Sequence, residues 1–514
     1  MSLAKILSSA VIGLDAKPIE VEVDLTSGLH LFSIVGLPDM AVKEAKERVF
    51  SALKNSRCQP PQKANQRIIV NLAPADIKKE GVGYDLPIAI GYLLASEQII
   101  FDSRDKLFIG ELSLDGKIRS FPGILPMTLM AKEMGIKTFF VPKENIKEAS
   151  LIQEVEIIGA ESVNELILHL EGKEPIKPTK QENNIFTRKQ SYPFDMSYIK
   201  GQESAKRALE IASAGAHNIL MSGPPGAGKT LLSRALASIM PEMSIEEALE
   251  VTKIYSISGK IEKTNPLITT RPFRNPHHTA SSVALIGGGQ NPRPGEISMA
   301  HRGVLFLDEF PEFHRDVLES LRQPLEDNVI TVSRASGTMV YPAKFMLVAA
   351  MNPCPCGNLG HARKLCSCTP TQTTKYKRKI SGPLLDRIDI HIEVPEVKYE
   401  KLREEKLQED SESIRKRVEK ARFLQKERFA EEKDKKILTN SEMTIPLIKK
   451  YCKLEDKSEL ILKNAMLKNN LSARSFHKIL KLSRTIADLA EEKDIKPENV
   501  AEAVQYRIGE DINL

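Results

Sequence analysis

The sequence contains no long hydrophobic run. No stretch approaches the roughly 18 consecutive apolar residues of a membrane-spanning helix, so we expect no transmembrane segment and no membrane partner. The first residues also lack the unbroken apolar stretch of a signal peptide, because Ser8, Ser9 and Asp15 interrupt it. The composition, with 41% hydrophobic and 28% charged residues, is typical of a soluble globular protein, and we expect a cytoplasmic location.

Neither sign of charge dominates the sequence. The formal net charge is +6, and this mildly basic balance permits a polyanionic partner without requiring one. The length of 514 residues is too great for one hydrophobic core and suggests about three domains.

The first 170 residues predict a separate α+β unit. Apolar and polar residues alternate over 19–25, and a second strand is expected over 29–35, which together predict a hairpin. Helical spacing follows over 40–55, and 86–95 has the pattern of a buried helix.

The remainder of the chain divides into three parts. Residues 171–195 are rich in Lys, Pro, Glu and Asn and predict a linker. Over 196–395, apolar strands return between helices, which indicates a parallel sheet wrapped by helices. Residues 396–514 predict helices. Within them, 396–436 is typical of a solvated helix with a narrow apolar stripe, although a nucleic-acid-binding arm is an alternative.

A glycine-rich loop follows the short apolar strand that begins at Ile219. The residues expected to bind a nucleotide are Gly223, Pro224, Pro225, Gly226, Ala227, Gly228, Lys229, Thr230 and Leu231. Glycines let backbone N–H groups turn toward phosphates, and the helix that begins here adds its positive dipole. Lys229 is expected to reach the β- and γ-phosphates of ATP, and Thr230 to offer its hydroxyl to Mg²⁺.

Two carboxylates end a second apolar strand, Val304 to Leu307. Asp308 is expected to hold the Mg²⁺ shell, and Glu309 to orient and deprotonate the water that attacks ATP. Two acids in this place can also cap a helix, but their combination with a phosphate-binding loop favours catalysis.

These motifs carry a resemblance to a known family. Residues 195–510 resemble the magnesium-chelatase-like branch of the AAA+ ATPases, and the whole chain resembles the ComM/YifB proteins. Besides the loop at 223–230, the strings that carry the resemblance are Arg271-Pro-Phe-Arg-Asn-Pro-His-His278, Gly303-Val-Leu-Phe-Leu-Asp-Glu309, Ala350-Met-Asn-Pro-Cys-Pro-Cys-Gly357 and Leu384-Leu-Asp-Arg-Ile-Asp389. The resemblance implies a P-loop core with a helical lid.

The resemblance also implies roles for three further residues. Asn352 would be the sensor of the γ-phosphate or the water, Arg387 the arginine finger given to a neighbouring subunit, and Arg474 the second sensor on the lid. A finger that acts on a neighbour implies a ring, by analogy a homohexamer. Without the family, Asn352 could merely turn the chain, and Arg387 could pair with Asp386 or Asp389.

Cysteine is scarce outside one cluster. Four of the six cysteines, Cys354, Cys356, Cys366 and Cys368, lie within the loop 354–368. Two C-x-C pairs at this separation can close one S₄ site, for which Zn²⁺ is the expected occupant. The spacing departs from the common C-x₂₋₄-C, so free thiols stay an alternative, and His361 could replace one cysteine.

The first 170 residues resemble the Lon-protease-like domain of ComM/YifB proteins, which implies a ribosomal-protein-S5-like fold. A Lon-type site needs a serine nucleophile and a lysine base. Gly83 stands where the serine is expected, and the stretch 124–127 lacks the lysine. We therefore expect an interaction or ring-forming domain without protease residues.

Two stretches are candidates for contact with DNA. One is the Arg-, Gly- and His-rich insertion that contains Arg271, Arg274, His277 and His278 and continues to residue 293; the other is a hairpin expected over 329–341. Basic loops in a ring channel suit a phosphate backbone of single-stranded or branched DNA.

The function that the resemblance implies is a hexameric helicase that moves branched DNA during natural transformation. Alternatives are a magnesium-chelatase-type motor subunit and an ATP-driven remodeller of protein partners. A scaffold without motor activity is disfavoured because Lys229, Asp308 and Glu309 are all present, and an ATP-dependent protease because its serine and lysine are missing.

Overall fold

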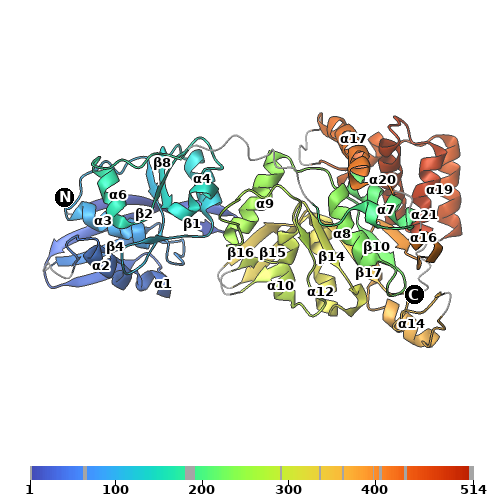
Figure 1. Ribbon diagram of the computed structural model, residues 1–514, viewed down its shortest axis with the longest axis horizontal. Coiled ribbons are helices and arrows are strands. Elements are labelled where there is room, and N and C mark those ends of the chain that lie inside the picture. Colours follow the sequence, from blue (N-terminus) through green and yellow to red (C-terminus); the bar gives the residue numbers. More distant parts are fainter. Residues whose placement is uncertain are drawn as a thin grey trace. The chain divides into compact units, whose positions relative to one another are not determined.

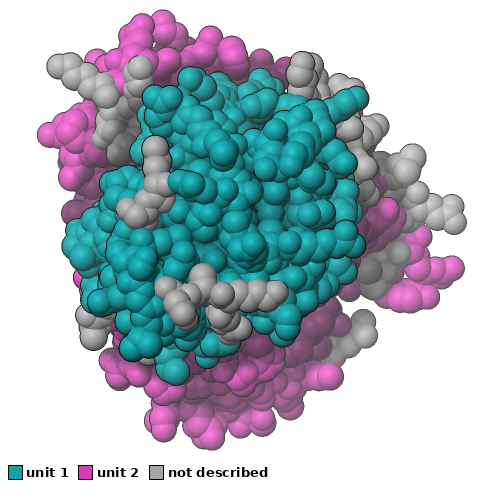
Figure 2. Space-filling view, turned by 90° about the vertical axis from the view of Figure 1, so that its left-hand side faces the viewer, with its two compact units in different colours: residues 1–188, 245–268 teal, residues 189–244, 269–514 magenta. Residues whose placement is uncertain are grey.

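The computed structural model describes residues 3–61, 66–179, 192–289, 292–334, 337–361, 364–397, 399–403, 408–432, 437–469 and 471–508. The chain forms two compact units. The first unit comprises Met1–Arg188 together with Ile245–Ile268, and the second comprises Lys189–Ser244 together with Thr269–Leu514 (Figures 1 and 2). Of the expected linker 171–195, residues 180–191 lie outside the described residues.

The first unit contains a seven-stranded mixed sheet. Its strands, in the order in which they lie side by side, are β3 (Leu31–Val35), β4 (Gln66–Ala73), β2 (Asp15–Ser27), β1 (Leu3–Ile12), β5 (Lys106–Phe108), β8 (Thr138–Pro142) and β9 (Glu156–Ala160). A separate two-stranded ribbon joins β6 (Glu111–Leu112) to β7 (Ile118–Arg119).

The hairpin predicted between 19–25 and 29–35 is wrong. Strand β2 pairs with β1 on one edge and β4 on the other, both antiparallel, and β3 pairs with β4 in parallel. Alternation of apolar residues identifies a strand, but it does not choose the neighbour, because both edges of a strand offer the same backbone groups.

Helices cover this sheet. They are α1 (Met40–Lys43), α2 (Ala45–Asn55), α3 (Asp85–Ala95), α4 (Ile124–Glu133), α5 (Ile146–Ala149) and α6 (Val163–Leu170). Helix α3 is apolar on nearly all sides and packs against β1 and β2, as a buried helix must. The helical stretch predicted over 40–55 is divided at Glu44 into α1 and α2.

One helix of the first unit comes from far along the chain. Helix α9 (Ile245–Ile257) packs against α4, and the Ser256 hydroxyl donates to the buried Glu148 at 2.5 Å. We had expected 196–395 to form one uninterrupted domain, whereas 245–268 folds with the first unit. Helical periodicity shows that a segment has an apolar face but not which surface that face covers.

The second unit is built on a five-stranded parallel sheet (Figure 1). The strand order is β11 (Phe273–Arg274), β14 (Val304–Leu307), β17 (Met346–Met351), β10 (Ile219–Ser222) and β18 (Ile390–Glu393), and every pairing is parallel. Strands β14 and β17 are buried along their whole length, as expected of a sheet covered on both faces. This arrangement fits the expected AAA+ core.

Parallel pairing decides where the site lies. All carboxyl ends of the strands are at one edge, where ligands of such sheets bind. The loop from Gly223, the pair Asp308 and Glu309, and Asn352 follow β10, β14 and β17 at this edge.

The helices and hairpins between these strands complete the core. The helices are α7 (Glu203–Gly215), α8 (Lys229–Ile239), α10 (Ser282–Ile286), α11 (Glu296–Met299), α12 (Arg315–Ser320), α13 (Arg322–Asp327), α14 (Pro370–Lys377) and α15 (Gly382–Leu385). Two hairpins join β12 (Gly287–Gly288) to β13 (Arg293–Pro294) and β15 (Val329–Arg334) to β16 (Gly337–Pro342), and the second confirms the hairpin predicted over 329–341.

The C-terminal part is helical. Its helices are α16 (Tyr399–Arg403), α17 (Ser411–Phe429), α18 (Ile445–Tyr451), α19 (Asp456–Lys468), α20 (Ala473–Leu489) and α21 (Pro497–Ile508). Helix α17 buries Ile414, Val418 and Phe429 against α7, α8 and α20, which confirms the predicted narrow apolar stripe. No helix among the described residues has the length and hydropathy to cross a membrane.

Candidate nucleotide and metal site

The glycine-rich loop leads from β10 into α8, the strand–loop–helix order that was predicted. Gly226 and Gly228 have φ angles of 79° and 90°, which favour glycine, and a Cβ at either position would meet nothing within 4 Å. The loop is therefore an open cradle with room for a ligand beside its backbone, which is what a triphosphate requires.

Lys229 is the first residue of α8 and is directed into this loop. Its Nζ donates to the carbonyl oxygens of Gly223 at 2.5 Å and Pro224 at 3.0 Å, and to Oδ1 of Asn352 at 3.2 Å. Burial lowers the pKa of Lys229 from its ordinary value, opposed by the charge of Asp308. Phosphate oxygens can replace these neutral acceptors and offer the ammonium group a stronger, charge-assisted partner.

The two residues expected to hold magnesium lie together. Thr230 Oγ1 donates to Oδ2 of Asp308 at 2.8 Å, although 78 positions separate them in the sequence. A hydroxyl and a carboxylate beside a phosphate-binding loop match the oxygen ligands that Mg²⁺ prefers, and waters and phosphate oxygens would complete its shell. The residues present therefore fit the ion.

Glu309 follows Asp308 in the left-handed conformation, with φ at 51°. It precedes a 3₁₀ turn, Phe310–Glu312, but its side chain makes no capping hydrogen bond. Instead Oε2 lies 3.1 Å from Nδ1 of His278. This contact was not foreseen from the sequence, where His278 was noted only as part of a basic insertion.

Asn352 directly follows β17, and its Oδ1 accepts from Lys229. It thus lies beside the glycine-rich loop, the position that the expected sensor role requires. The hydroxyl of Tyr376, on α14, faces the backbone N–H of Asn352. Burial raises the pKa of Tyr376 to about 12, so this hydroxyl stays protonated at neutral pH.

Arg387 and Arg474 meet at a single carboxylate. Glu326, on α13, pairs with Arg387 and lies 3.8 Å from Nη2 of Arg474. The hydrogen bond from Arg387 lowers the pKa of Glu326. Neither Asp386 nor Asp389, the alternatives considered for Arg387, is the partner found among the described residues.

The segment that carries Arg387 contacts two of the C-terminal helices. Lys478, on α20, lies 2.8 Å from Oδ1 of Asp389, and Arg507, on α21, donates to the carbonyl of Ile388 at 2.5 Å. The segment that carries Arg387 is therefore in direct contact with the helix that carries Arg474.

The four cysteines come together as predicted. Their Sγ atoms lie within 4.8 Å of one another. Cys354 is 3.5 Å from Cys356 and 3.6 Å from Cys366, and Cys356 is 3.6 Å from Cys366. A tetrahedron with Zn–S bonds of about 2.3 Å places its sulfurs about 3.8 Å apart. Four thiolates in this arrangement fit Zn²⁺ with no open position, which is typical of a structural site.

Two further features concern this loop. Backbone N–H groups of Asn358 and Ser367 lower the pKa of the Cys356 thiol to about 5, which favours the thiolate that a metal binds. His361 is outside the sulfur cluster: its Nε2 lies 3.5 Å from Glu396. The structure thus does not support the alternative in which His361 replaces a cysteine.

The cysteine loop also touches the phosphate-binding loop. A Cβ at Gly357 would lie 2.6 Å from the side chain of Pro225, so the backbone at Gly357 packs closely against the proline ring. The loop begins next to Asn352, and α14, which follows it, returns to Asn352 through Tyr376. The fold of the cysteine loop therefore supports both the cradle and the candidate sensor.

Two arginines of the insertion are structural. Arg271 donates to the carbonyls of Pro241 at 2.6 Å and Arg302 at 2.7 Å, and Arg274 makes a bidentate pair with Glu296 at 2.5 and 2.8 Å. These guanidinium groups hold neighbouring segments together and are poor candidates for DNA contacts.

The two hairpins of the second unit pack together. Tyr341 Oη donates to the carbonyl of Pro292 at 2.7 Å, and a Cβ at Gly288 would lie 3.0 Å from the Arg334 guanidinium. Arg293 and Arg334 are both exposed. We call this surface, formed by β12–β13 and β15–β16, the paired hairpins.

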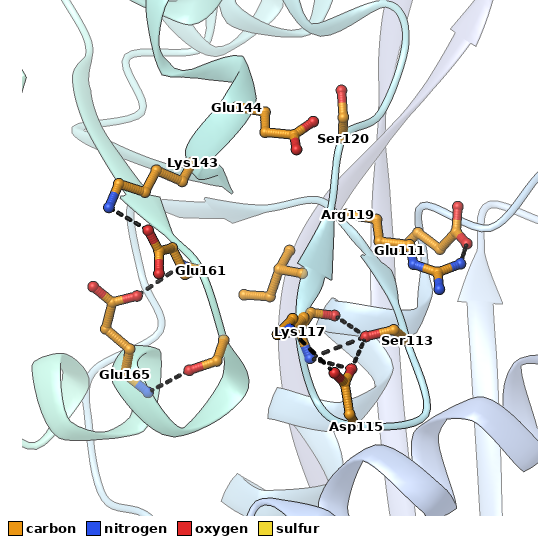
Figure 3. Close-up of a pocket in the computed structure, with 12 residues that line it drawn as sticks. Glu111, Ser113, Asp115, Lys117, Arg119, Ser120, Lys143, Glu144, Glu161 and Glu165 are labelled. Carbon is orange, nitrogen blue, oxygen red and sulfur yellow. Dashed lines mark hydrogen bonds and ion pairs between the residues drawn. The ribbon is translucent and has the colours of Figure 1, made fainter.

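The first unit lacks space where a Lon-type serine would stand. A Cβ at Gly83 would lie 2.8 Å from the Phe121 ring and 2.9 Å from Ile109. A pocket of about 1050 Å³ elsewhere in this unit is lined by charged residues that pair with one another, among them Lys143 with Glu161 and Arg119 with Glu111 (Figure 3). The Ser113 hydroxyl in this pocket is within hydrogen-bond distance of the Asp115 carboxylate and of the backbone carbonyl of Lys117, and its bonding to Lys117 is through the backbone and not through the lysine amine.

A glycine-rich loop, the hydroxyl–carboxylate pair Thr230 and Asp308, and Glu309 lie at the carboxyl edge of a five-stranded parallel sheet, the arrangement expected of an AAA+ core. The sequence matches three families: magnesium chelatase, subunit ChlI, over residues 195–402; subunit ChlI of Mg-chelatase over 21–145; and magnesium chelatase, subunit ChlI C-terminal, over 408–507.

Full-length relatives narrow the assignment. The chain is 43% identical over 514 residues to the competence protein ComM of Haemophilus influenzae, covering 99% of this chain and 98% of that protein. It is 42% identical over 511 residues to YifB of Escherichia coli, covering 99% and 97%. A magnesium-chelatase 38 kDa subunit of Cereibacter sphaeroides is 27% identical over 177 residues, covering 31% of this chain and 53% of that subunit. The protein belongs to the ComM/YifB family.

Proposed function

We propose that the protein is an ATP-driven DNA motor, a hexameric branch-migration helicase that acts on recombination intermediates in natural transformation. The observation that carries the proposal is the convergence of Lys229, Thr230, Asp308 and Glu309 at one sheet edge, with an exposed basic surface on the paired hairpins of the same unit. The relative named a competence protein supports the connection with transformation.

Each residue of the site has its own role in ATP hydrolysis. Lys229 and the loop backbone bind the phosphates, and Thr230 with Asp308 holds Mg²⁺, which neutralises phosphate charge. Glu309 accepts a proton from the attacking water, and Asn352 orients that water or the γ-phosphate. The water oxygen forms a bond to the γ-phosphorus while the bond from that phosphorus to the bridging oxygen breaks. The products are ADP and phosphate, and Glu309 passes the proton it accepted to the released phosphate.

Arg387 and Arg474 act on the nucleotide of the neighbouring subunit. Both guanidinium groups lie beside Glu326, which supports a shared target for them. A complete site then requires two subunits, and therefore a ring.

A second candidate is a magnesium-chelatase-type motor subunit. The match of residues 195–402 to magnesium chelatase, subunit ChlI, favours it. The candidates differ in one measurable respect, because a DNA motor is stimulated by DNA whereas a chelatase motor depends on partner subunits.

The test is ATP hydrolysis by the purified protein alone and with single-stranded, duplex, forked and four-way-junction DNA, with Glu309→Gln as the inactive control. We expect strong stimulation by branched DNA and resolution of junctions only during hydrolysis. Hydrolysis that is indifferent to every DNA would contradict the DNA-motor proposal, leave the ATPase assignment intact, and redirect attention to a chelatase substrate or protein partners.

A further inference from the structure

One stretch of the second unit carries positive charge and no negative charge. Residues 328–385 contain eight lysines and arginines and no aspartate or glutamate, whereas the formal net charge of the whole chain is only +6. The rest of the chain is therefore slightly acidic in sum. Six of the eight cations lie between residues 363 and 379, in the cysteine loop and in α14, which follows it. A strong charge of one sign on a short segment attracts a partner of the opposite sign.

Three of these cations are available to a partner. Lys364, Lys375 and Arg378 are exposed, and within the described part of the chain no carboxylate pairs with any of them. Two other cations of the stretch are already paired, Lys379 with Glu312 at 2.7 Å and Lys344 with Glu442 at 3.6 Å. The unpaired charge is thus concentrated on the cysteine loop and on the outer side of α14.

Helix α14 shows which of its sides is free. Tyr376, on the helix, and Ile380, just after it, are 5% and 2% exposed and anchor its inner side. Thr371, Lys375 and Arg378 are spaced by four and three positions and are all exposed, so they lie on one outer side. We call Lys364 together with these three residues the basic loop surface.

The backbone beneath the basic loop surface is well fixed. The sulfur atoms of the four cysteines lie within 4.8 Å of one another, and Cys368 directly precedes the N-cap of α14. A capping box holds the start of the helix, because the Thr369 hydroxyl accepts from the Gln372 N–H and the Gln372 side chain accepts from the Thr369 N–H. Cations on a fixed backbone lose less conformational entropy on binding than cations on a flexible tail.

Stabilisation of the helix explains only part of this charge. Lys375 and Lys377 lie in the last turn of α14, where cations interact favourably with the helix dipole. Lys364, however, precedes the helix by six positions, and the stretch lacks the acids that accompany lysines on an ordinary solvated surface. The basic loop surface therefore calls for an external anion.

We propose that the basic loop surface binds the phosphate backbone of DNA as a second contact, separate from the paired hairpins. Ammonium, guanidinium and hydroxyl groups all bind phosphate oxygens and give affinity without a choice of sequence. Figure 1 shows α14 well apart from β15 and β16 within the second unit. The inference rests on the proposed DNA-motor function: a branched DNA has more than one arm, and two separate contacts allow the motor to hold two of them.

The experiment uses full-length protein and three multiple variants. The neutral variant removes three charges of the basic loop surface: Lys364→Gln/Lys375→Gln/Arg378→Gln. The charge-keeping variant exchanges the same residues for the other basic type: Lys364→Arg/Lys375→Arg/Arg378→Lys. The matched control removes three exposed lysines from α19, where acids accompany them: Lys457→Gln/Lys463→Gln/Lys468→Gln.

The main measurement is fluorescence anisotropy of labelled single-stranded, duplex and four-way-junction DNA at several salt concentrations, with a non-hydrolysable ATP analogue present. We expect the neutral variant to bind about 10- to 100-fold more weakly than the wild type. Its plot of log affinity against log salt should be shallower by about 0.9 per removed cation for duplex DNA, or about 0.7 for single strands. The DNA form that loses affinity identifies which strands the surface contacts.

The charge-keeping variant and the α19 control should bind every DNA as the wild type does. ATP hydrolysis without DNA, thermal unfolding and the oligomeric state by light scattering should be unchanged in all three variants. Equal loss of affinity in the α19 control would show an effect of net charge alone and overturn the proposal. A neutral variant that no longer assembles would make this surface a contact between copies of the chain, which also overturns it.

Wild-type affinity and salt dependence in the neutral variant would exclude the basic loop surface and leave the proposed motor function intact. DNA binding by the wild type without any stimulation of hydrolysis would contradict the motor function, and the affinity of the neutral variant would still decide the surface. A wild type that binds no DNA would contradict both.

Discussion

Both units contain a strand that leads through a glycine-containing loop into a buried helix, and the two loops differ in what fills them. In the second unit, β10 leads to α8, and positions Gly226 and Gly228 face open space. In the first unit, β4 leads to α3, and the space at Gly83 is occupied by Phe121 and Ile109. A ligand site needs an empty volume with hydrogen-bond donors around it. Of these two loops, the one at Gly226 and Gly228 in the second unit supplies such a volume, and the one at Gly83 does not.

The two units also differ in the surroundings of a buried lysine. Lys229 donates to loop carbonyls and to Asn352, and Lys79 in the first unit donates to the carbonyl of Pro74 and is fully buried. Burial lowers the pKa of both amines. The difference is that Lys229 borders the open cradle, so a ligand can reach it, whereas Lys79 is enclosed by protein.

The largest expected effect follows from this difference. Lys229→Ala should abolish nucleotide binding and hydrolysis, because the cradle loses its fixed positive charge. The matched variant Lys79→Met should leave nucleotide affinity unchanged and affect thermal stability instead. Fluorescent-nucleotide titration and thermal unfolding measure both, and tight nucleotide binding by Lys229→Ala would remove its assigned role.

Arg387→Ala should reduce turnover about a thousandfold while sparing nucleotide binding, the effect expected of an arginine finger. Mixing it with Lys229→Ala should restore part of the activity, because the second variant supplies an intact finger to the first. Glu326→Gln, which keeps the size of the partner of Arg387, serves as the control. No recovery on mixing would argue against action between subunits.

Glu309→Gln should lower kcat by about 100-fold or more and retain bound ATP, since a general base contributes on that scale. The measurement is single-turnover hydrolysis with separation of bound ATP from ADP. Glu312→Gln, on the adjacent turn, is a control with a carboxylate directed to Lys379 at 2.7 Å. A Glu309→Gln protein that turns over normally would exclude Glu309 as the base.

Loss of the expected Zn²⁺ should have a smaller effect, which we expect on ATP binding by the glycine-rich loop. We expect about one Zn²⁺ per chain by metal analysis, as an S₄ cluster implies. Cys368→Ser should lose the metal and weaken ATP binding about two- to tenfold, because the cysteine loop supports Pro225 and Asn352. Cys58→Ser, outside the cluster, should change neither quantity. Unaltered ATP affinity in metal-free Cys368→Ser would show that the cysteine loop does not contribute to ATP binding.

The smallest effect on hydrolysis is expected at Gly83. Gly83→Ser should create no peptidase activity, since the added side chain meets Phe121 and no lysine stands beside it. It should destabilise the first unit by about 1–3 kcal/mol, the usual size of overpacking. Thermal unfolding and a casein digestion assay test this, and detectable proteolysis would show that the loop is closer to a Lon-type site than its packing indicates.

The sequence determined the local elements of the second unit. The strand–loop–helix at 223–230, the strand before Asp308 and the hairpin at 329–341 depend on residues that are neighbours in the chain. For the same reason the approach of the four cysteines could be expected, since Cys368 is only fourteen positions after Cys354.

The tertiary structure decided which distant residues meet. Helix α9 folds with the first unit, and β3 pairs with β4. Arg387 and Arg474 both lie beside Glu326, and His278 lies beside Glu309. Periodicity reports that a face is apolar or a group is charged, but the partner depends on how the whole chain packs. Local chemistry could therefore be read from the sequence, whereas the contacts between distant residues around the site became visible only in the fold.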